Sequence, residues 1–265
     1  HQPHNLTAIR AVRAAAPALR YLGPPGSFSE SAARQFAVGL TGAGEHSVQI
    51  EPTGSFDDVL EFTRTGGLGV LPVTSSASGL VSRSTRALLG CDADLIAGGV
   101  VDVAVRFDAY AAAPVMLAEL KGAPVFSHPQ ALAQCANFIT RWGLDPQPCA
   151  STTDALYRLR EVRGPAIAIA SSGAEADHGF VHVVEREIDD LSGSITRFLI
   201  VGQPDAFAEH RDGSDPTLRR IVLAPSVASI GHLIGRGAGF DELLTDAEGQ
   251  CLWVSSQVSV EVPPG

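Results

Sequence analysis

The chain has 265 residues, of which 45% are hydrophobic and 18% are charged, and its formal net charge is -10 at neutral pH. This composition is typical of a globular protein with room for two domains, and the negative charge disfavours general binding to nucleic acid or to a membrane surface. No apolar run reaches the roughly 18 residues that a membrane span requires, and the N-terminal residues lack the apolar core of a signal peptide, so we expect a cytoplasmic protein.

Four cysteines are scattered along the chain, and none of them forms a C-x-x-C pair. The sequence therefore shows neither a zinc knuckle nor a redox motif. Isolated cysteines most often fill a core as small apolar residues, and we expect the same here. The four are Cys91, Cys135, Cys149 and Cys251.

After an Ala- and Arg-rich start, which predicts a loose extension or a short helix over residues 1–19, apolar runs alternate with polar helix starts. This β-α-β-α rhythm predicts an α/β fold with a parallel sheet, in which ligands bind at the carboxyl ends of the strands. The first half of the chain supplies predicted strands at 18–22, 48–52 and 69–73, helices that begin near 27 and 55, and a helix that ends at 89.

The first predicted strand runs into a loop rich in glycine and proline, Gly23-Pro24-Pro25-Gly26-Ser27-Phe28-Ser29. Either serine can cap the helix that follows. A loop that feeds a helix N-terminus presents backbone N–H groups and the positive end of the helix dipole, which suit a carboxylate or a phosphate. The loop is neither a Walker loop nor a G-x-G-x-x-G, so it does not indicate a nucleotide.

A long apolar stretch at 96–107 predicts a crossover into a second domain, where the same rhythm continues. The sequence here favours several short strands bounded by helix starts, which again indicates a sheet covered by helices. The predicted strands are 125–126, 166–170, 181–184 and 198–201, and the predicted helices are 131–142, one that begins at 151, and 174–178.

Turns that lead from a strand into a helix repeatedly carry Ser, Thr or His, at the positions where an α/β sheet binds ligands. Five such turns in succession indicate a cleft lined with hydroxyl groups and helix N-termini, suited to a small polyanion. The candidate ligand-binding residues in these turns are Ser27, Ser29, Thr74, Ser75, Ser76, Ser127, His128, Ser151, Thr152 and Ser171.

Thr196, Arg197 and Phe198 stand where the last strong apolar run begins. A hydroxyl and a guanidinium held at the end of a rigid strand suit a proton donor and an anion clamp, because Arg can bind a carboxylate with two hydrogen bonds. An equally open interpretation is that Arg197 points away from the ligand and braces the fold.

Three other patterns suggest different chemistry and are weaker. His178 and His182 have the spacing of a metal pair on a helix, but Gly179 and the β-rich residues that follow disfavour a helix there. His128 is either an acid/base group or a structural cap partner. The glycine-rich segment 235–239 does not join a strand to a helix, so it is interpreted as a loop, and no nucleophile elbow supports a Ser-His-Asp triad.

The ordered set of loops resembles that of prephenate dehydratases over about residues 20–202. The motifs that carry the resemblance are the glycine loop, a Ser-His-Pro-Gln segment, a Ser-Thr-x-x-Ala helix start and a final Thr-Arg-Phe. They correspond to Gly23–Ser29, Ser127-His128-Pro129-Gln130, Ser151-Thr152-Thr153-Asp154-Ala155 and Thr196-Arg197-Phe198, with Ile188 and Asp190 at the usual distance before the last.

The resemblance implies a two-lobed α/β domain similar to type II periplasmic binding proteins, with lobe 1 over about 20–97 and 188–204 and lobe 2 over about 98–187. It also implies a lyase of phenylalanine biosynthesis that takes the dicarboxylate prephenate to phenylpyruvate as a homodimer, without a metal or an organic cofactor. Thr196 would assist departure of the ring hydroxyl, Ser76 is the retained serine of a second catalytic motif, and Arg197 and Phe198 would join the binding residues.

This chain departs from the family pattern at two places. The family's Glu-Asn-Ser motif is Thr74-Ser75-Ser76 here, and the Asn that precedes Thr-Arg-Phe by two residues is Ser194. A carboxylate and two amides are thereby replaced by hydroxyls. Three alternatives therefore stay open: a decarboxylase of secondary metabolism that leaves the ring non-aromatic, a catalytically silent protein that binds an aromatic acid, and a divergent enzyme that acts on a different polyunsaturated acid.

The tail, residues 205–265, begins with a polar linker and then predicts one β-α-β-β unit. Strands at 220–223 and 252–262 and a helix at 228–234 resemble part of an ACT domain, the phenylalanine-binding module that many family members carry. The ligand-loop motifs of that module are missing, so we expect no feedback by phenylalanine through this tail.

Overall fold

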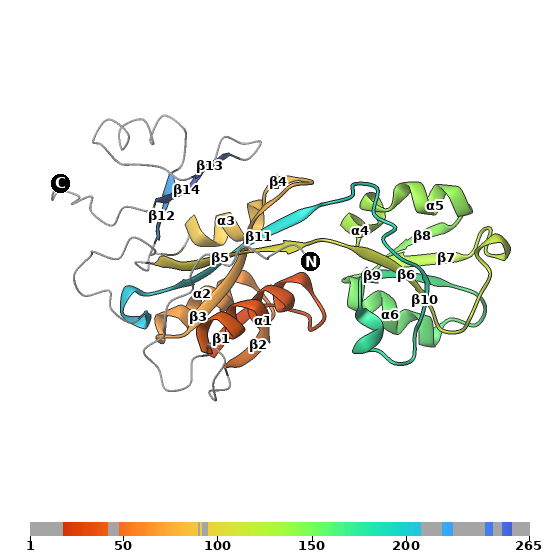
Figure 1. The fold of residues 1–265 in the computed structure, drawn as a ribbon, viewed down its shortest axis with the longest axis horizontal. Coiled ribbons are helices and arrows are strands. Elements are labelled where there is room, and N and C mark those ends of the chain that lie inside the picture. Colours follow the sequence, from red (N-terminus) through yellow and green to blue (C-terminus); the bar gives the residue numbers. More distant parts are fainter. Residues whose placement is uncertain are drawn as a thin grey trace. The chain divides into compact units, whose positions relative to one another are not determined.

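The computed structural model describes residues 18–41, 48–89, 91, 95–207, 219–224, 242–245 and 251–255, which form two compact units (Figure 1). The first unit contains the described residues up to Gly23, then Ser29–Val103, and those from Ile195 onward. The second unit contains Pro24–Phe28 and Ala104–Ser194. The chain is therefore a two-unit α/β protein, as the sequence predicted.

The first unit is built on a mixed sheet with the strand order β13-β14-β12-β5-β11-β3-β1-β2, and a short strand β4 pairs with β3. Strand β1 runs parallel to both β2 and β3, whereas β11 is antiparallel to β3. The elements before the tail are β1 (Ala18–Leu22), α1 (Phe28–Thr41), β2 (Gln49–Thr53), α2 (Phe56–Arg64), β3 (Leu68–Ser75), β4 (Gly79–Leu80), α3 (Ser82–Leu89), β5 (Ile96–Ala104), β11 (Ile195–Gly202) and the 3₁₀ turn η3 (Pro204–Ala206).

Helix α2 shows how the sequence determines this unit. Ser55 has an extended backbone and its side chain accepts a hydrogen bond from Asp58 N at 3.1 Å, so the predicted cap is confirmed. Val59 and Leu60 are buried in a core cluster that also contains Leu71 of β3 and Leu199 of β11. The helix thus packs on the two strands whose ends carry most of the candidate residues of this unit.

The second unit has its own sheet, with the order β10-β6-β9-β7-β8. Strand β7 is parallel to β8 and β9, and β6 is antiparallel to β9 and β10. Its elements are β6 (Phe107–Ala111), η1 (Leu117–Glu119), β7 (Pro124–Ser127), α4 (Pro129–Gln134), α5 (Ala136–Trp142), β8 (Asp145–Pro148), α6 (Thr152–Glu161), β9 (Ile167–Ser171), η2 (Ala174–Ala176) and β10 (His182–Glu185).

Strand β9 forms the centre of this unit because both of its faces are buried. Ile167 and Ile169 belong to one core cluster, while Ala168 and Ala170 belong to the cluster on the other face. Alternate residues of a strand point to opposite faces, so a run with no polar residue is what a sheet covered on both sides requires. The strand ends at Ser171, which enters the site described below.

Several local expectations were wrong. The helix predicted over 131–142 is divided at Cys135, whose φ of −121° and ψ of 27° end α4 before α5 begins. The helix predicted over 174–178 is a single 3₁₀ turn, η2. Strand β8 was not predicted, because Asp145–Pro148 contains two prolines, which strands tolerate at a sheet edge such as this one.

The chain crosses between the units at other positions than the sequence suggested. It crosses after Val103 and after Ser194, whereas the expected lobe boundaries were 98 and 187. The stretch 96–107 is strongly apolar throughout, so its composition shows no break between β5 and β6. The loop Pro24–Phe28, expected in the first lobe, belongs to the second unit.

The described part of the tail consists of three strands, β12 (Arg219–Ala224), β13 (Glu242–Thr245) and β14 (Cys251–Ser255). Strand β14 pairs antiparallel with both β12 and β13, and β12 also pairs antiparallel with β5. Two predicted features, the helix at 228–234 and the glycine-rich loop at 235–239, lie outside the described residues, as does the remainder of the strand predicted to reach residue 262.

Cys91, Cys135 and Cys149 are free thiols, and Cys135 and Cys149 are buried, which confirms the expectation for these two. Burial raises the pKa of both thiols, so neither is a reactive thiolate near neutral pH. Among the helices that the structure describes, none combines the length and apolar character that a membrane crossing would need.

Candidate active site

The first group of candidate residues lies where β3 and β11 pair at the end of their ladder. Thr196 is opposite Ser75, and Arg197 is opposite Thr74. The next pair is Phe198 with Pro72, so Val73 is an extra residue that forms a β-bulge. A bulge suits Pro72, which cannot donate a ladder hydrogen bond, and it reorients the side chains that follow.

Ser76 fixes the register of this ladder end. Its backbone N–H donates to Ile195 O at 2.9 Å, and its hydroxyl accepts from Ile195 N at 2.8 Å. The neighbouring Ser75 is buried, and its hydroxyl accepts from Ala77 N at 3.2 Å. Thr196 is half-buried and directly follows Ile195, whose backbone N and O both bind Ser76, so the backbone that carries its hydroxyl is fixed.

Arg197 lies on the opposite face of β11 from Thr196, because alternate residues of a strand face opposite ways. Its Nε and Nη2 contact the two carboxylate oxygens of Asp102 in β5 at 2.8 and 3.0 Å. This bidentate pair joins neighbouring strands of the first unit. Of the two open interpretations, the structure therefore favours the one in which Arg197 braces the fold. The guanidinium N–H groups that could bind a ligand carboxylate already bind Asp102.

Two of the predicted binding residues lie in the core. Phe198 is 2% exposed and is among the largest fully buried side chains. Ser127 is 0% exposed, and its hydroxyl donates to Ile169 O at 2.7 Å. Both side chains therefore belong to the core of their unit, and neither is exposed to a ligand at its surface.

The glycine loop is fastened to the second unit by two hydroxyl groups. Thr153 Oγ1 donates to Pro25 O at 3.0 Å, and Ser171 Oγ donates to Gly26 O at 3.2 Å. Gly26 has a φ of 83°, which a residue with a side chain rarely adopts. Phe28 packs edge-on against Phe107 at 5.6 Å between ring centroids. Ser27, directly before α1, and Ser29, in its first turn, are half-buried.

Helix starts account for two other candidates. Ser151 is the N-cap of α6, where its side chain accepts from Asp154 N at 2.9 Å. His128 is the N-cap of α4, where Nδ1 accepts from Gln130 N at 3.2 Å. The geometry therefore supports the interpretation of His128 as a structural cap rather than as an acid/base group. Thr152, the first residue of α6, is half-buried beside the cap.

His178 reaches the glycine loop, a placement that the sequence does not indicate, because its spacing from His182 suggests only a metal pair. Its ring packs edge-on against Tyr157 and Phe180, at 5.4 and 5.8 Å between centroids. A Cβ added to Gly26 would lie 3.9 Å from His178 Nε2. Within the described ranges, no three His, Cys, Asp or Glu side chains come together as metal ligands would.

The structure thus gathers the candidates into one group in each unit. The first unit brings together Thr74, Ser75, Ser76 and Thr196, and the second brings together the glycine loop, Thr153, Ser171 and His178. The first group consists of hydroxyls and backbone atoms, and the second adds the imidazole of His178 to them. Such groups can orient a polar ligand and donate hydrogen bonds to it without covalent chemistry.

Comparison with known proteins gives a consistent result. A family model described as prephenate dehydratase matches residues 19–206. The prephenate dehydratase of Methanocaldococcus jannaschii is 30% identical over 194 residues, which cover 73% of this chain and 67% of the relative. An arogenate dehydratase/prephenate dehydratase of Arabidopsis thaliana is 31% identical over 186 residues, 69% of this chain and 45% of that protein, so the chain spans about half of it.

A solved structure shows the same fold. The prephenate dehydratase of Arthrobacter aurescens, determined in complex with L-Phe, superposes with a TM-score of 0.68 at 22% identity. The match covers 89% of this chain and 79% of that one. At 22% identity this structural similarity shows a shared fold, whereas the sequence matches above show common ancestry.

Proposed function

The chain belongs to the prephenate dehydratase family, and from this we propose that it is a lyase that converts prephenate into phenylpyruvate. In this reaction the bond from the ring to its carboxylate breaks, and its electron pair enters the ring. The ring hydroxyl leaves with a proton as water, and carbon dioxide is released. Aromatisation supplies the driving force, so the protein has to orient the substrate and assist the departing oxygen.

The observation that carries the proposal is the position of Thr196 at the locked end of the β3–β11 ladder, opposite Ser75. We assign the Thr196 hydroxyl as the hydrogen-bond donor to the leaving oxygen. A donor fixed before the reaction stabilises developing negative charge without reorganising, and loss of one such donor typically lowers kcat about 10²- to 10³-fold. The buried Phe198, two residues along the same face, keeps this part of β11 rigid.

Ser76 is assigned a supporting catalytic role. Its hydroxyl accepts from Ile195 N, so its own proton remains available for a donated hydrogen bond next to Thr196. Thr74 and Ser75 are assigned to substrate binding in the place of the family's acidic and amide side chains. Arg197 acts through Asp102 as a brace that keeps β11 in position.

In the second unit we assign carboxylate binding to the glycine loop and to the start of α6. The capping hydroxyl of Ser151 accepts from Asp154 N and can still donate its proton. The N-terminus of a helix favours negative charge, and Thr152 adds a second hydroxyl there. These groups would hold a substrate carboxylate by hydrogen bonds rather than by a full positive charge.

The test is conversion of prephenate, followed by mass and by the ultraviolet absorbance of phenylpyruvate. The variant Thr196→Val should lower kcat about 10²- to 10³-fold, and Thr196→Ser should retain most of the activity because it keeps the donor. Thr63→Val is a matched control: Thr63 is fully buried in α2, and its hydroxyl donates only within that helix, to Leu60 O at 2.6 Å. That variant should keep its kcat, and full activity in Thr196→Val would refute the assignment.

The same measurement decides between the dehydratase and its alternatives. Release of carbon dioxide with a non-aromatic keto acid as product would indicate a decarboxylase, an outcome motivated by Thr74 and Ser75 in place of the usual acidic and amide residues. Calorimetric binding of prephenate without any product would indicate a silent binding protein. Either result would overturn the proposed dehydration.

A further inference from the structure

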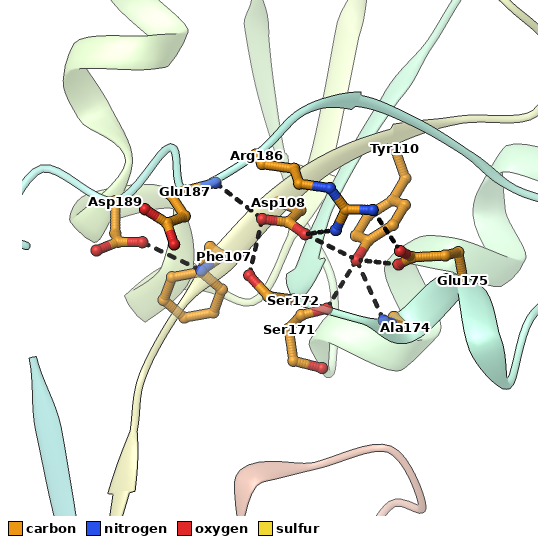
Figure 2. Close-up of polar contacts among 10 residues, drawn as sticks. All are labelled: Phe107, Asp108, Tyr110, Ser171, Ser172, Ala174, Glu175, Arg186, Glu187 and Asp189. Atoms are coloured by element: carbon orange, nitrogen blue, oxygen red, sulfur yellow. Dashed lines mark hydrogen bonds and ion pairs between the residues drawn. The ribbon is translucent and has the colours of Figure 1, made fainter. Parts of the chain in front are cut away.

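Asp108, in β6, is a fully buried carboxylate at the centre of a polar network in the second unit (Figure 2). An ionised group in such a place has to be paired and hydrogen-bonded, because burial removes its hydration. Arg186 provides the opposite charge and also contacts Glu175 at 2.8 Å. The groups that donate to Asp108 are Ser172 Oγ at 2.7 Å, Glu187 N at 2.8 Å, Arg186 Nη1 at 3.1 Å and Tyr110 OH at 3.5 Å.

The Tyr110 hydroxyl connects this network to the turn that follows β9. It accepts from Ala174 N at 3.2 Å. It carries one proton and has three acceptors within reach, which are Ser171 O at 2.9 Å, Glu175 Oε2 at 3.0 Å and Asp108 Oδ2 at 3.5 Å. Burial, and then the negative charge of Asp108, raises the pKa of Tyr110 well above its ordinary value. The group is therefore a permanent donor near neutral pH.

Several contacts of the network converge on residues 171–175. Tyr110 binds the backbone at both Ser171 and Ala174, and Ser172 binds Asp108. Gly173 lies between them with a left-handed φ of 88°, so the turn is sharp and its shape depends on these contacts. Figure 2 shows the turn approached from one side by the network, with the Ser171 side chain on its other side.

On the side of the turn away from the Asp108 network, Ser171 binds the glycine loop. Ser171 donates its hydroxyl proton to Gly26 O at 3.2 Å, although the two residues are far apart in the sequence. A continuous path of hydrogen bonds therefore runs from the Tyr110 hydroxyl, through the backbone of Ser171, to the loop. Tyr110 itself is fully buried and so is not placed to contact a ligand.

We propose that Tyr110 is a positioning residue, which sets the shape of the glycine loop through Ser171. The role in catalysis rests on the proposed function, since that loop is assigned to a substrate carboxylate. The physical reason is that removal of the hydroxyl takes a hydrogen-bond partner from the half-buried Ala174 N and Ser171 O, which loosens the turn and with it the bond to Gly26.

The first test is Tyr110→Phe in the full chain, which deletes the hydroxyl and keeps the ring. Amide hydrogen exchange should become about tenfold faster at residues 171–175 and at residues 26–28, two segments that the Ser171–Gly26 hydrogen bond joins. In prephenate turnover, KM should rise about tenfold while kcat stays within about twofold, because binding geometry rather than the leaving-group donor is affected.

Tyr21→Phe is the matched control, since it also removes a buried tyrosine hydroxyl beside a carboxylate, that of Glu30, in the first unit. It should leave exchange at residues 171–175 and the KM unchanged. Unchanged exchange and KM in Tyr110→Phe would overturn the proposal. So would faster exchange with an unaltered KM in an enzyme that converts prephenate.

Ser171→Ala provides an independent variant, because it removes only the half-buried link to Gly26. It should speed exchange at residues 26–28 and raise KM, and the double variant with Tyr110→Phe should show no larger KM than the more affected single variant. Additive effects would show that Tyr110 does not act through Ser171. If the wild-type protein does not convert prephenate, the proposed function fails, and the exchange data still decide the positioning role.

Discussion

Gly26 occupies a backbone conformation that makes its replacement informative. Its φ of 83° costs an L-residue about 1 to 2 kcal/mol, and a Cβ there would lie 3.1 Å from Thr153 Oγ1, which holds the loop. We predict that Gly26→Ala lowers the free energy of unfolding by about that amount and also raises the KM for prephenate. Urea unfolding and steady-state kinetics measure the two effects.

Gly122→Ala separates these two effects. Gly122 has nearly the same φ, 79°, but nothing lies within 4 Å of its added Cβ, and its N–H donates to Gly143 O at 2.7 Å, which is not a candidate residue. This variant should show a similar loss of stability and unchanged kinetics. A KM that rises equally in both variants would mean that general strain, rather than the glycine loop, affects the reaction.

Single residues also show where sequence reasoning reached its limit. The capping role of Ser151 could be predicted because a cap is a local pattern, and Thr196 could be placed at a strand end. The partner of Arg197 could not, because Asp102 lies 95 residues earlier and only strand order makes the two neighbours. Ser127 has the residue type of a ligand-binding group, and only its burial shows that its hydroxyl serves Ile169 O instead.

Helices α2 and α6 offer a prediction at the level of elements, because both begin with the same Ser-x-x-Asp cap. Ser55 and Ser151 have nearly equal backbone angles, and each accepts from the aspartate amide three residues later. Replacement of either by Ala should lower the free energy of unfolding by about 1 kcal/mol. Only Ser151→Ala should also raise the KM for prephenate, because only that cap is assigned to a carboxylate.

Thermal or urea unfolding gives the two stability changes, and kinetics give the difference between the caps. If Ser55→Ala and Ser151→Ala behave alike in both measurements, Ser151 is a structural cap and its assignment to the substrate is wrong.

Elements with strong local patterns could be predicted from the sequence, and those shaped by their neighbours could not. The apolar runs of β3 and β9 lie within or close to the predicted ranges, since burial on both faces requires such runs. The division between α4 and α5 at Cys135 and the proline-containing edge strand β8 have no comparable local signal. The rhythm also indicated parallel pairing throughout, whereas β11 and β6 are antiparallel to their neighbours.

At the scale of the whole molecule, the two-unit α/β organisation follows from the repeated strand-helix rhythm, but its boundaries do not. The strands β5 and β6 follow each other within one apolar stretch, so no change of composition marks the passage from one unit to the other. The short loop Pro24–Phe28 joins the second unit through hydrogen bonds from Thr153 and Ser171, which are contacts of high sequence separation. Assignment of a segment to a unit depends on such contacts.

Each unit buries one tyrosine, and this predicts how the stability of the whole protein depends on pH. Burial, and then the charge of Glu30, raises the pKa of Tyr21 in the first unit to about 12, and burial raises the pKa of Tyr110 in the second unit further. Below the unfolded value of about 10, both hydroxyls are protonated whether the chain is folded or not, and their contribution is complete. Above that pH the unfolded chain releases these protons and the folded chain retains them, so stability falls.

Urea unfolding between about pH 8 and about pH 12 should therefore show a loss of at most about 1.4 kcal/mol per pH unit for each tyrosine once pH exceeds about 10. The comparison with Tyr21→Phe isolates the contribution of this tyrosine from that of every other ionisable group. The free energy of unfolding of Tyr21→Phe should fall less steeply with rising pH than that of the wild type. Only one of its tyrosines, Tyr110, then has a pKa that folding raises in this way. Parallel curves for the two proteins would mean that Tyr21 releases its proton equally readily when folded, and that its burial beside Glu30 does not raise its pKa.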